Sequence, residues 1–497
     1  MAEARPNILI FMTDQQHGGT VLPGHRLKAQ TPTLDRFQQQ ATTFSRAYCP
    51  APHCCPSRAT FFTGRYPSEH GVWNNVNVPN ALSRGLFPSV RPWSVDLKEA
   101  GYQLGFSGKW HVGQDHSPEH YGWDLVHGGS YVTPTPNDRE AELRAAQAQT
   151  LANMDAFRQH VAPEDRGEGE IIRPGYPRYV HYGQRENPFG DTTTTEAGIA
   201  KMTSMAAAGE PWCQYIGTLG PHDPYFVPQR FLDLYDPDDL PPLPDNFADA
   251  MDDKPALYRR MSDRFAQLSE EEHRQAIRHY LAFCSYEDWL FGQVLEALDA
   301  TGQAENTWVL YLSDHGDYVG EHGLWTKGLP AFDGAYHVPA IVRPPVSIDN
   351  ASKGQSVEAM VSLADFGPTF AEATKVETYQ AMSGESLMPW FGSESPAEWR
   401  DAMFFQTNGN EVYGIQRTIM TDDWKLTFNA FDYDELYDRK ADPGQVTNLY
   451  GKPGYQDIQR ELYARLWTMM LDHRDDYMNP YICTALADFG PGLARSE

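Results

Sequence analysis

Four short apolar runs constrain the fold of this chain more than any other feature, because polar residues follow each of them directly. The runs are NILIFMT (7–13), YQLGFSG (102–108), WCQYIGTLG (212–220) and TWVLYLS (307–313). Runs of this length and composition are typical of buried strands, and helical patterns such as residues 276–298 lie between them. Strands that alternate with helices predict an α/β fold with a large mixed, mostly parallel sheet flanked by helices.

The polar residues after these runs predict one composite site. In an open parallel sheet, ligands bind beyond the carboxyl ends of the strands, so polar clusters at four such ends should meet. The clusters are Asp14 with Gln15, Lys109 with His111, His222, and Asp314 with His315. A single Asp after one strand is equally well explained as a loop cap, but the coincidence of four clusters favours a functional site.

The length of 497 residues suggests more than one domain. After about residue 385 the pattern changes to alternating, aromatic-rich strands separated by turn signals. We therefore predict a catalytic domain over residues 1–385 and a smaller C-terminal α+β domain with an antiparallel sheet and a tail over 386–497. A polar stretch rich in Pro, Gly and charge predicts a long insertion at about 130–200.

The charge balance restricts the partners. Lys and Arg total 40 against 67 Asp and Glu, so the net charge is −27. Such a chain repels nucleic acid and anionic membranes on average, and an anionic substrate would need a local cationic pocket. No apolar run is long enough for a signal-peptide core or a membrane span, and six cysteines without a signal do not indicate a disulfide framework. We expect a cytoplasmic protein with reduced thiols.

The segment AYCPAPHCCPSRATFFTGRYPSEHG (47–71) contains three of the six cysteines. Its cysteines could be metal ligands, a disulfide, buried apolar residues or a nucleophile. A buried structural role is favoured for Cys49. The adjacent Cys54 and Cys55 are poorly placed to grip one tetrahedral zinc ion, and no second paired-cysteine motif accompanies them.

The residues after the two cysteines favour a nucleophile. Pro56 suits the first turn of a helix, so the helix should begin at the cysteines. A helix N-terminus presents free N–H groups and a partial positive charge, and Arg58 adds a cation with a fork for an oxyanion. A group derived from a thiol at this position is placed to attack an anionic ester.

The motif Cys54-Cys55-Pro56-Ser57-Arg58, followed by Thr63-Gly64-Arg65, resembles the Cys-x-Pro-Ser-Arg signature of type I, formylglycine-dependent sulfatases. These belong to the alkaline phosphatase superfamily and are related to arylsulfatases, choline sulfatases and phosphonate monoester hydrolases. Other segments similar to family landmarks are GKWHVG (108–113), PHDPYFVP (221–228), SDHGDYVGEHGLWTKG (313–328), VSLADFGPTFAEA (361–373) and ELYDRKADPGQVTNL (435–449). The resemblance covers most of the chain and implies an alkaline-phosphatase-like fold.

The resemblance implies two cofactors. A separate formylglycine-generating enzyme would oxidise Cys54 to Cα-formylglycine, whose hydrate attacks sulfur through one hydroxyl and releases sulfate through the other. A divalent cation would be held by Asp14, Gln15, Asp314 and His315 together with the modified Cys54. Oxygen ligands suit Ca²⁺, the common ion of the family, or Mg²⁺, and the imidazole also suits Mn²⁺. Relatives often carry Asp at position 15 and Asn at position 315, which leaves the identity of the metal open.

Further roles follow from the same resemblance. Arg58, Lys109 and Lys327 would surround the sulfate oxygens and offset their charge. Asp314 is also a candidate base for the attacking hydroxyl, and Asn75 is a weaker candidate for the rim of the sulfate site.

Two histidines complete the predicted set. His111 would take a proton when sulfate is released, and His222 would face the leaving oxygen as a general acid or hydrogen-bond donor. His181, Tyr182 and Arg185 are polar enough for a substrate rim, although a purely structural role is favoured for them.

The expected reaction is hydrolysis of an organic sulfate monoester, and aryl, choline, alkyl and sugar sulfates all fit the motifs. The alternative is a phosphonate monoester or phosphodiester hydrolase, since those relatives share the Gln and His ligands; the Lys109/His111 pair and Leu104 favour the sulfatase. A binding protein whose Cys54 stays a thiol is less favoured, because all expected catalytic positions are filled. The aromatic tail at 466–490 could dock on its own chain or on a neighbour, so a dimer or tetramer stays open.

Overall fold

The computed structural model describes residues 5–78, 81–114, 116–128, 165–348, 353–392, 395–410, 412–479 and 486–494, together with 144, 147, 148 and 151. Within these residues no helix is long and apolar enough to cross a membrane.

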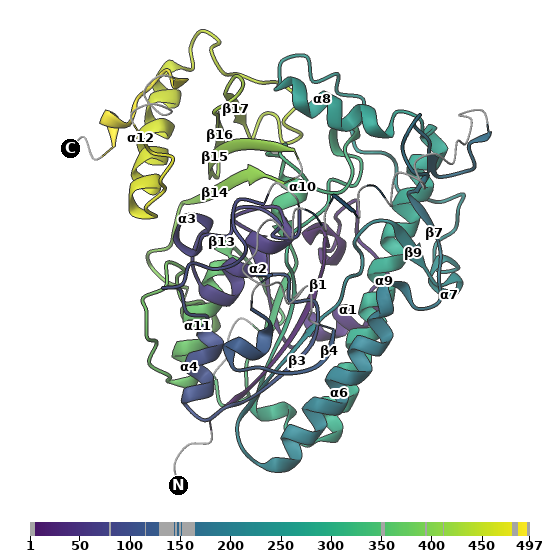
Figure 1. Cartoon of the computed structure of the whole chain (residues 1–497), viewed down its shortest axis with the longest axis vertical. Coiled ribbons are helices and arrows are strands. Elements are labelled where there is room, and N and C mark those ends of the chain that lie inside the picture. The colour runs from purple at the N-terminus through teal and green to yellow at the C-terminus, as the bar shows by residue number, and fades with distance from the viewer. Residues whose placement is uncertain are drawn as a thin grey trace.

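A nine-stranded mixed sheet forms the centre of the molecule (Figure 1). Its strands are β1 (Asn7–Thr13), β2 (Thr42–Tyr48), β3 (Gln103–Gly108), β4 (Asp124–Gly128), β8 (Trp212–Gly217), β10 (Thr307–Ser313), β11 (His337–Val338), β12 (Ala340–Arg343) and β13 (Ser356–Ser362). The order is β11-β2-β12-β10-β1-β8-β3-β4, with β13 paired to β2. The neighbours β10, β1, β8, β3 and β4 run parallel, whereas β12 is antiparallel to both β10 and β2. The predicted fold class is confirmed.

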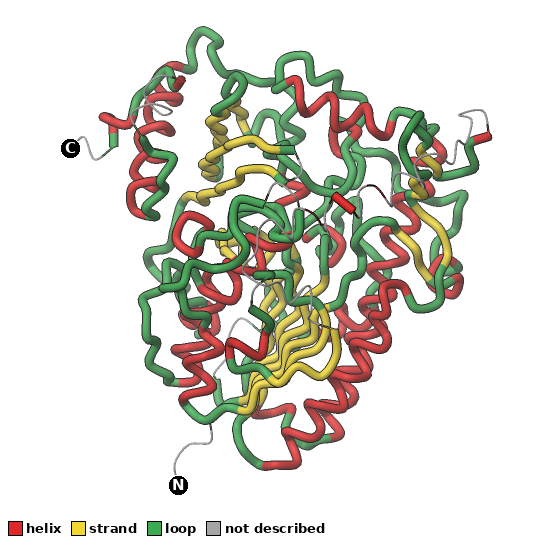
Figure 2. Tube along the Cα trace, viewed as in Figure 1, coloured by secondary structure: helices red, strands yellow, loops and turns green. Residues whose placement is uncertain are grey.

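Helices cover both faces of this sheet (Figure 2). One layer contains α1 (Pro32–Gln38), α6 (Asp191–Ala208) and α9 (Glu270–Ala300), and the other contains α2 (Cys54–Thr63), α4 (Trp93–Glu99) and α11 (Phe366–Thr374). Short helices α3 (Pro67–His70), α7 (Gln229–Leu232), α8 (Ala256–Ser262) and α10 (Asp333–Tyr336) lie in the connections. The α9 pattern recognised at 276–298 is part of a longer helix, which Ser269 caps by accepting the Glu272 N–H.

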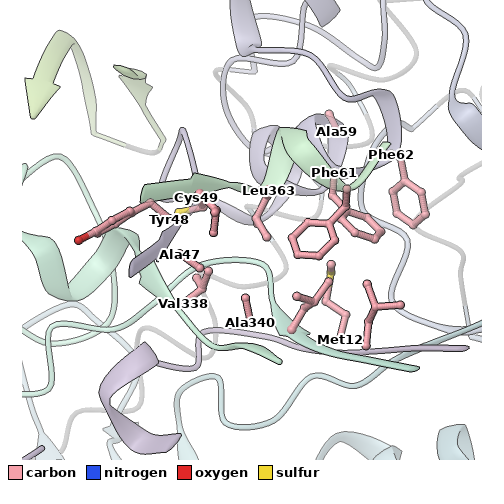
Figure 3. Packing of buried hydrophobic residues seen from close by; sticks show 14 of the residues in the cluster. Met12, Ala47, Tyr48, Cys49, Ala59, Phe61, Phe62, Val338, Ala340 and Leu363 are labelled. Atoms are coloured by element: carbon pink, nitrogen blue, oxygen red, sulfur yellow. The ribbon is translucent and has the colours of Figure 1, made fainter. Parts of the chain in front are cut away.

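Strand β1 shows why both faces need a cover. Every residue of β1 is buried, with alternate side chains joining different clusters. Met12 belongs to the same buried cluster as Phe61 of α2 (Figure 3). Leu9 and Phe11 belong to the cluster on the opposite face, which contains residues of α6 and α9. Both faces of β1 pack against apolar side chains, so polar functional residues can only follow at the end of the strand.

A separate four-stranded antiparallel sheet follows in the chain. It contains β14 (Ala402–Gly409), β15 (Tyr413–Thr421), β16 (Trp424–Asn429) and β17 (Glu435–Asp438), paired in sequence order. The helix α12 (Gln456–Asp472) packs on it, with the Trp467 and Phe428 rings 5.6 Å apart. This part of the aromatic tail therefore docks on its own chain, while the domain boundary near residue 385 stays a prediction.

The first half of the insertion predicted at about 130–200 falls mostly outside the described residues, which resume at residue 165. The described part of the insertion contains β5 (Glu170–Ile171), β6 (Tyr179–Val180) and β7 (Tyr182–Gln184), the last paired with β9 (Tyr225–Val227). Residues 191–200 already belong to α6, which packs on β3 and β8. The end of the predicted insertion is thus part of the core layer.

Candidate active site

The register of the central strands brings the predicted polar residues together. Thr13 lies opposite Ser313 in the parallel pair β1–β10, so the next residues, Asp14 and Asp314, are neighbours. Strand β3 lies on the other side of β1 from β10, with β8 between β1 and β3. It ends at Gly108, one residue before Lys109. The carboxyl ends of separate strands therefore form one site, as the sequence predicts.

Four buried side chains form the centre of the site. Asp14, Cys54, Asp314 and His315 each offer a ligand atom, and these atoms all lie within 4.8 Å of one another. His315 Nε2 is 3.2 Å from Cys54 Sγ, 3.4 Å from Asp14 Oδ1 and 3.6 Å from Asp314 Oδ1. This is the only such group of potential metal ligands among the described residues. Its donor set of carboxylates and an imidazole fits a divalent cation.

Gln15 also lies at this centre. Its backbone N–H donates to Asp314 Oδ1 over 3.2 Å, and its side-chain oxygen accepts from Lys327 Nζ over 2.6 Å. Its φ is 66°, a left-handed conformation that is uncommon outside glycine and that clusters at functional sites. The structure thus brings together all five residues predicted for the metal.

Helix α2 places Cys54 at its first turn, as Pro56 predicts. The N-terminal residue His53 makes no side-chain cap. Instead the Cys55 N–H donates to Asn75 Oδ1 over 3.0 Å. Asn75 therefore supports the head of the helix, and its role at a sulfate rim stays a prediction.

Arg58 holds the two central carboxylates in place. Its Nε donates to Asp314 Oδ2 over 2.7 Å, and an η nitrogen lies 3.5 Å from Asp14 Oδ2. The other η nitrogen donates to the Lys109 carbonyl over 3.0 Å and to the Tyr215 hydroxyl over 2.8 Å. The guanidinium is fully buried, and its contacts with Asp14 and Asp314 fix the positions of these carboxylates. A direct contact of Arg58 with sulfate stays a prediction.

The two adjacent cysteines have opposite environments. Burial raises the pKa of both thiols, but Lys109, Lys327 and His315 bring the pKa of Cys54 well below its usual value. The pKa of Cys55 stays well above its usual value, and its sulfur accepts only a backbone N–H, from Val76 over 3.4 Å. Cys54 lies in the cluster, whereas the Cys55 sulfur contacts the Val76 N–H; which of the two is modified stays a prediction.

The two predicted lysines lie on opposite sides of the cluster. Lys109 Nζ donates to Asp14 Oδ2. Lys327 Nζ lies 2.7 Å from His222 Nε2. Lys109 is buried and Lys327 half-buried, and the pKa values of both are raised, because Asp14 and Cys54 outweigh the effect of desolvation. Both lysines therefore stay charged beside the acidic groups of the site.

The pKa values of the two predicted histidines are shifted in opposite directions. Burial and Lys327 lower the pKa of His222, but Asp223, Cys54 and Asp14 outweigh them and raise it. Its Nδ1 lies 2.6 Å from the Asp223 carbonyl, which accepts its proton. Burial and Lys109 lower the pKa of His111, whose Nε2 lies 2.9 Å from Asn77 Oδ1. His222 is suited to donate a proton and His111 to accept one.

Sequence reasoning missed two acidic residues of the site. Asp223 contacts His222 and Gln15, and Asp317 accepts from Gln15 Nε2 over 2.7 Å. Both stand inside matched motifs, PHDP and SDHGD, so their positions in the motifs were the available signal. The residues considered for a substrate rim behave structurally: His181 and Tyr182 are buried, and Arg185 lies over the Phe226 ring.

Comparison with known families decides the identity. Residues 6–376 match the family Sulfatase, and residues 320–472 match the C-terminal region of N-sulphoglucosamine sulphohydrolase. The chain belongs to the sulfatase family. It is a sulfuric ester hydrolase of the alkaline phosphatase superfamily, as the motifs predict.

Individual relatives of this sulfatase are distant. It is 26% identical over 496 residues to "Uncharacterized sulfatase YidJ" of Escherichia coli (strain K12), covering 96% of this chain and 88% of the relative. It is also 26% identical to the choline-sulfatase of Rhizobium meliloti (strain 1021), covering 91% and 84%. The phosphonate monoester hydrolase of Agrobacterium radiobacter has the same fold, with a TM-score of 0.73, 22% identity and coverage of 94% and 96%.

Proposed function

We propose that this sulfatase hydrolyses small organic sulfate monoesters with Cα-formylglycine at position 54 and one divalent cation, Ca²⁺. The observation that carries the proposal is the position of Cys54, which lies among Asp14, Asp314 and His315 while Cys55 faces away. Asp14, Gln15, Asp314 and His315 would hold the cation, which would supply positive charge beside the nucleophile. The modified side chain would supply a hydroxyl nucleophile and a route to release sulfate without a stable ester.

The residues around this centre suit the binding of an anion. Lys109 is buried and Lys327 is half-buried, and both lower the pKa of Cys54; we assign both ammonium groups to the sulfate oxygens. Because their charges are fixed before substrate arrives, they cost little reorganisation in the transition state. Arg58 would orient the carboxylates Asp14 and Asp314 rather than the substrate.

The proton transfers are assigned to the two histidines. The Asp223 carbonyl accepts the Nδ1 proton of His222, and His222 Nε2 accepts from the Lys327 ammonium over 2.7 Å. We assign this hydrogen-bonded Lys327–His222 pair to the leaving oxygen as its proton donor. His111, with a lowered pKa, would accept the proton that leaves when sulfate is expelled. We assign no separate base role to Asp314, because its two oxygens already accept from Arg58, Gln15 and the His315 N–H.

We further propose maturation by a formylglycine-generating enzyme and a cytoplasmic location. The five cysteines among the described residues are free and buried, which suits a reducing compartment. The second candidate function is phosphonate monoester hydrolysis, favoured by Gln15 and His315 at the metal and by the matching fold.

The ratio of kcat/KM for an aryl sulfate and an aryl phosphonate monoester separates the two candidates. We expect the sulfate to be preferred. A preference of about a hundredfold or more for the phosphonate, or no turnover of any aryl, choline, alkyl or sugar sulfate, would contradict the proposal.

A further inference from the structure

Gln15 is the one amide in the proposed metal site, and an amide has two different ends. Only its oxygen can bind a cation, since the nitrogen is a donor. The left-handed backbone of Gln15, with φ of 66°, is secured by the Tyr280 hydroxyl, which donates to the Gln15 carbonyl over 2.9 Å. The backbone therefore fixes where the side chain starts, and its neighbours must fix which end faces the cation.

Two carboxylates lie at one end of the Gln15 amide. Nε2 donates to Asp317 Oδ2 over 2.7 Å and to Asp223 Oδ1 over 3.2 Å. At the other end, Oε1 accepts from Lys327 Nζ over 2.6 Å. Ionised carboxylates only accept and an ammonium only donates, so both ends demand the same orientation. The oxygen is directed toward the cationic side of the site.

Asp317 is itself immobilised. Its Oδ1 accepts from the Val319 and Thr326 N–H groups, both over 2.9 Å. Its Oδ2 accepts from the Tyr225 hydroxyl over 2.6 Å as well as from Gln15. The carboxylate is fully buried, and four donors occupy its two oxygens, so it has no alternative arrangement.

The second carboxylate has a similar support. Asp223 Oδ2 accepts from the Tyr179 hydroxyl over 3.0 Å. Tyr179 belongs to the described part of the predicted insertion, whereas Asp223 follows the catalytic His222. One function of the insertion is thus to hold the acidic side of this network.

We propose that Asp317 is a positioning residue that, together with Asp223, clamps the Gln15 amide with its oxygen toward the cation. The inference rests on the proposed function, in which Gln15 binds that cation. A carboxylate at position 15 would meet Asp317 and Asp223 as like charges.

A double-mutant cycle tests the clamp through charge exchange. In Asp317→Asn, the new amide would face Tyr225 and Gln15 with a nitrogen, and Gln15 would have to turn its own nitrogen toward the cation. In Gln15→Glu, the new carboxylate would face Asp317. The double variant Gln15→Glu/Asp317→Asn restores a donor opposite an acceptor, so it should recover what each single variant loses.

Ca²⁺ affinity of the full-length parent chain with residue 54 unchanged, measured by titration calorimetry, is the first readout. Mutation of a residue that hydrogen-bonds to a metal ligand and orients it typically costs about 10- to 100-fold in metal affinity. Each single variant should therefore bind Ca²⁺ at least about tenfold more weakly than the parent. The double variant should recover to within about threefold of the parent. Affinities of the double variant equal to the product of the single losses would overturn the clamp.

The second readout is the thermal midpoint of the metal-free protein, which does not depend on activity or on Ca²⁺. We expect both single variants to unfold at lower temperature and the double variant to regain most of the loss. Independent, additive losses would overturn the clamp. If the parent binds no Ca²⁺, the proposed cation fails, while this metal-free cycle still decides the clamp.

Two control variants separate orientation from general damage. Tyr225→Phe removes one donor to Asp317 and should weaken Ca²⁺ binding less than Asp317→Asn does. Asp288→Asn changes another buried carboxylate, which lies outside the proposed metal site. Asp288 accepts the Thr33 and Leu34 N–H groups from a segment distant in the sequence. It should lower the thermal midpoint without changing Ca²⁺ affinity and without rescue by Gln15→Glu. Equal loss of Ca²⁺ affinity in Asp288→Asn and Asp317→Asn would assign Asp317 a merely structural role.

Discussion

Two pairs of buried acidic side chains lie near the carboxyl end of the central sheet, and they differ in the charged groups that surround them. Asp14 and Asp314 contact Arg58, and Asp14 also contacts Lys109. The second pair consists of Asp191 in α6 and Glu287 in α9. Both pairs are removed from solvent, so burial alone does not distinguish them.

The pKa values separate the pairs. Burial raises the pKa of Asp14, but Lys109, His222 and Arg58 bring it well below its usual range. Burial raises the pKa of Asp191 to about 7, and it raises that of Glu287 well above its usual value. The Thr218 hydroxyl lowers the pKa of Glu287, but by less than burial and Asp191 raise it. Cations placed around Asp14 favour its charged form, whereas burial favours the protonated forms of Asp191 and Glu287.

The pairs are connected through one loop. Asp191 accepts the Leu219 and Gly220 N–H groups over 2.9 and 2.8 Å, and the Gly220 carbonyl accepts the Asp14 N–H over 3.0 Å. This loop leads to His222. The comparison teaches that, in the proposed function, Asp14 and Asp314 hold the cation, whereas Asp191 supports the loop that carries His222.

The largest expected effect comes from the residue that faces the charged pair. Cys54→Ala should abolish turnover, because the precursor of the nucleophile is gone. Cys55→Ala is the matched control and should retain much of the activity, since its sulfur faces Val76. Steady-state kinetics on an aryl sulfate measure both. Exchanged phenotypes would mean that the register of the motif is wrong.

The cations come next. Lys327→Ala should lower kcat/KM by about 10² or more, because the anion loses a preorganised partner. Lys425 is also a buried lysine, but it pairs with Asp333 outside the site. Lys425→Ala should lower the thermal midpoint and leave kcat/KM within a few fold, after correction for folded protein. An unchanged kcat/KM in Lys327→Ala would remove that residue from the site.

The neutral pair should have a smaller effect, visible in stability. The folded pKa of Glu287 lies above its unfolded value of 4.5. The folded state therefore holds more protons, and the free energy of unfolding should fall as pH rises above about 4.5. Glu287→Gln should reduce this fall, measured by urea unfolding at pH 5 and pH 8, by on the order of 1 kcal/mol. An unchanged pH profile would show that Glu287 is ionised in the folded protein.

Much of the site could be predicted because it depends on local signals. A buried strand followed by Asp14, or a helix that starts at Cys54, is visible within about ten residues of sequence. The strand ends then meet because parallel strands share one edge. The family motif supplied the register that separates Cys54 from Cys55.

What escaped prediction depends on contacts between distant segments. Nothing near Asp317 in the sequence shows that it faces Gln15, and nothing near Glu287 shows that it has no cationic partner. The contact of the Lys109 ammonium with Asp14 is likewise set by tertiary packing. Such pairings are fixed by the crossing of whole elements, which periodicity does not record.

The chemical state of residue 54 is the most direct test of the proposed function. Mass spectrometry of the tryptic peptide that contains both cysteines, from protein co-produced with a formylglycine-generating enzyme, measures it. We predict an aldehyde or its hydrate at Cys54 and an intact thiol at Cys55. An unmodified thiol at Cys54 in protein that hydrolyses sulfate esters would contradict the proposed nucleophile.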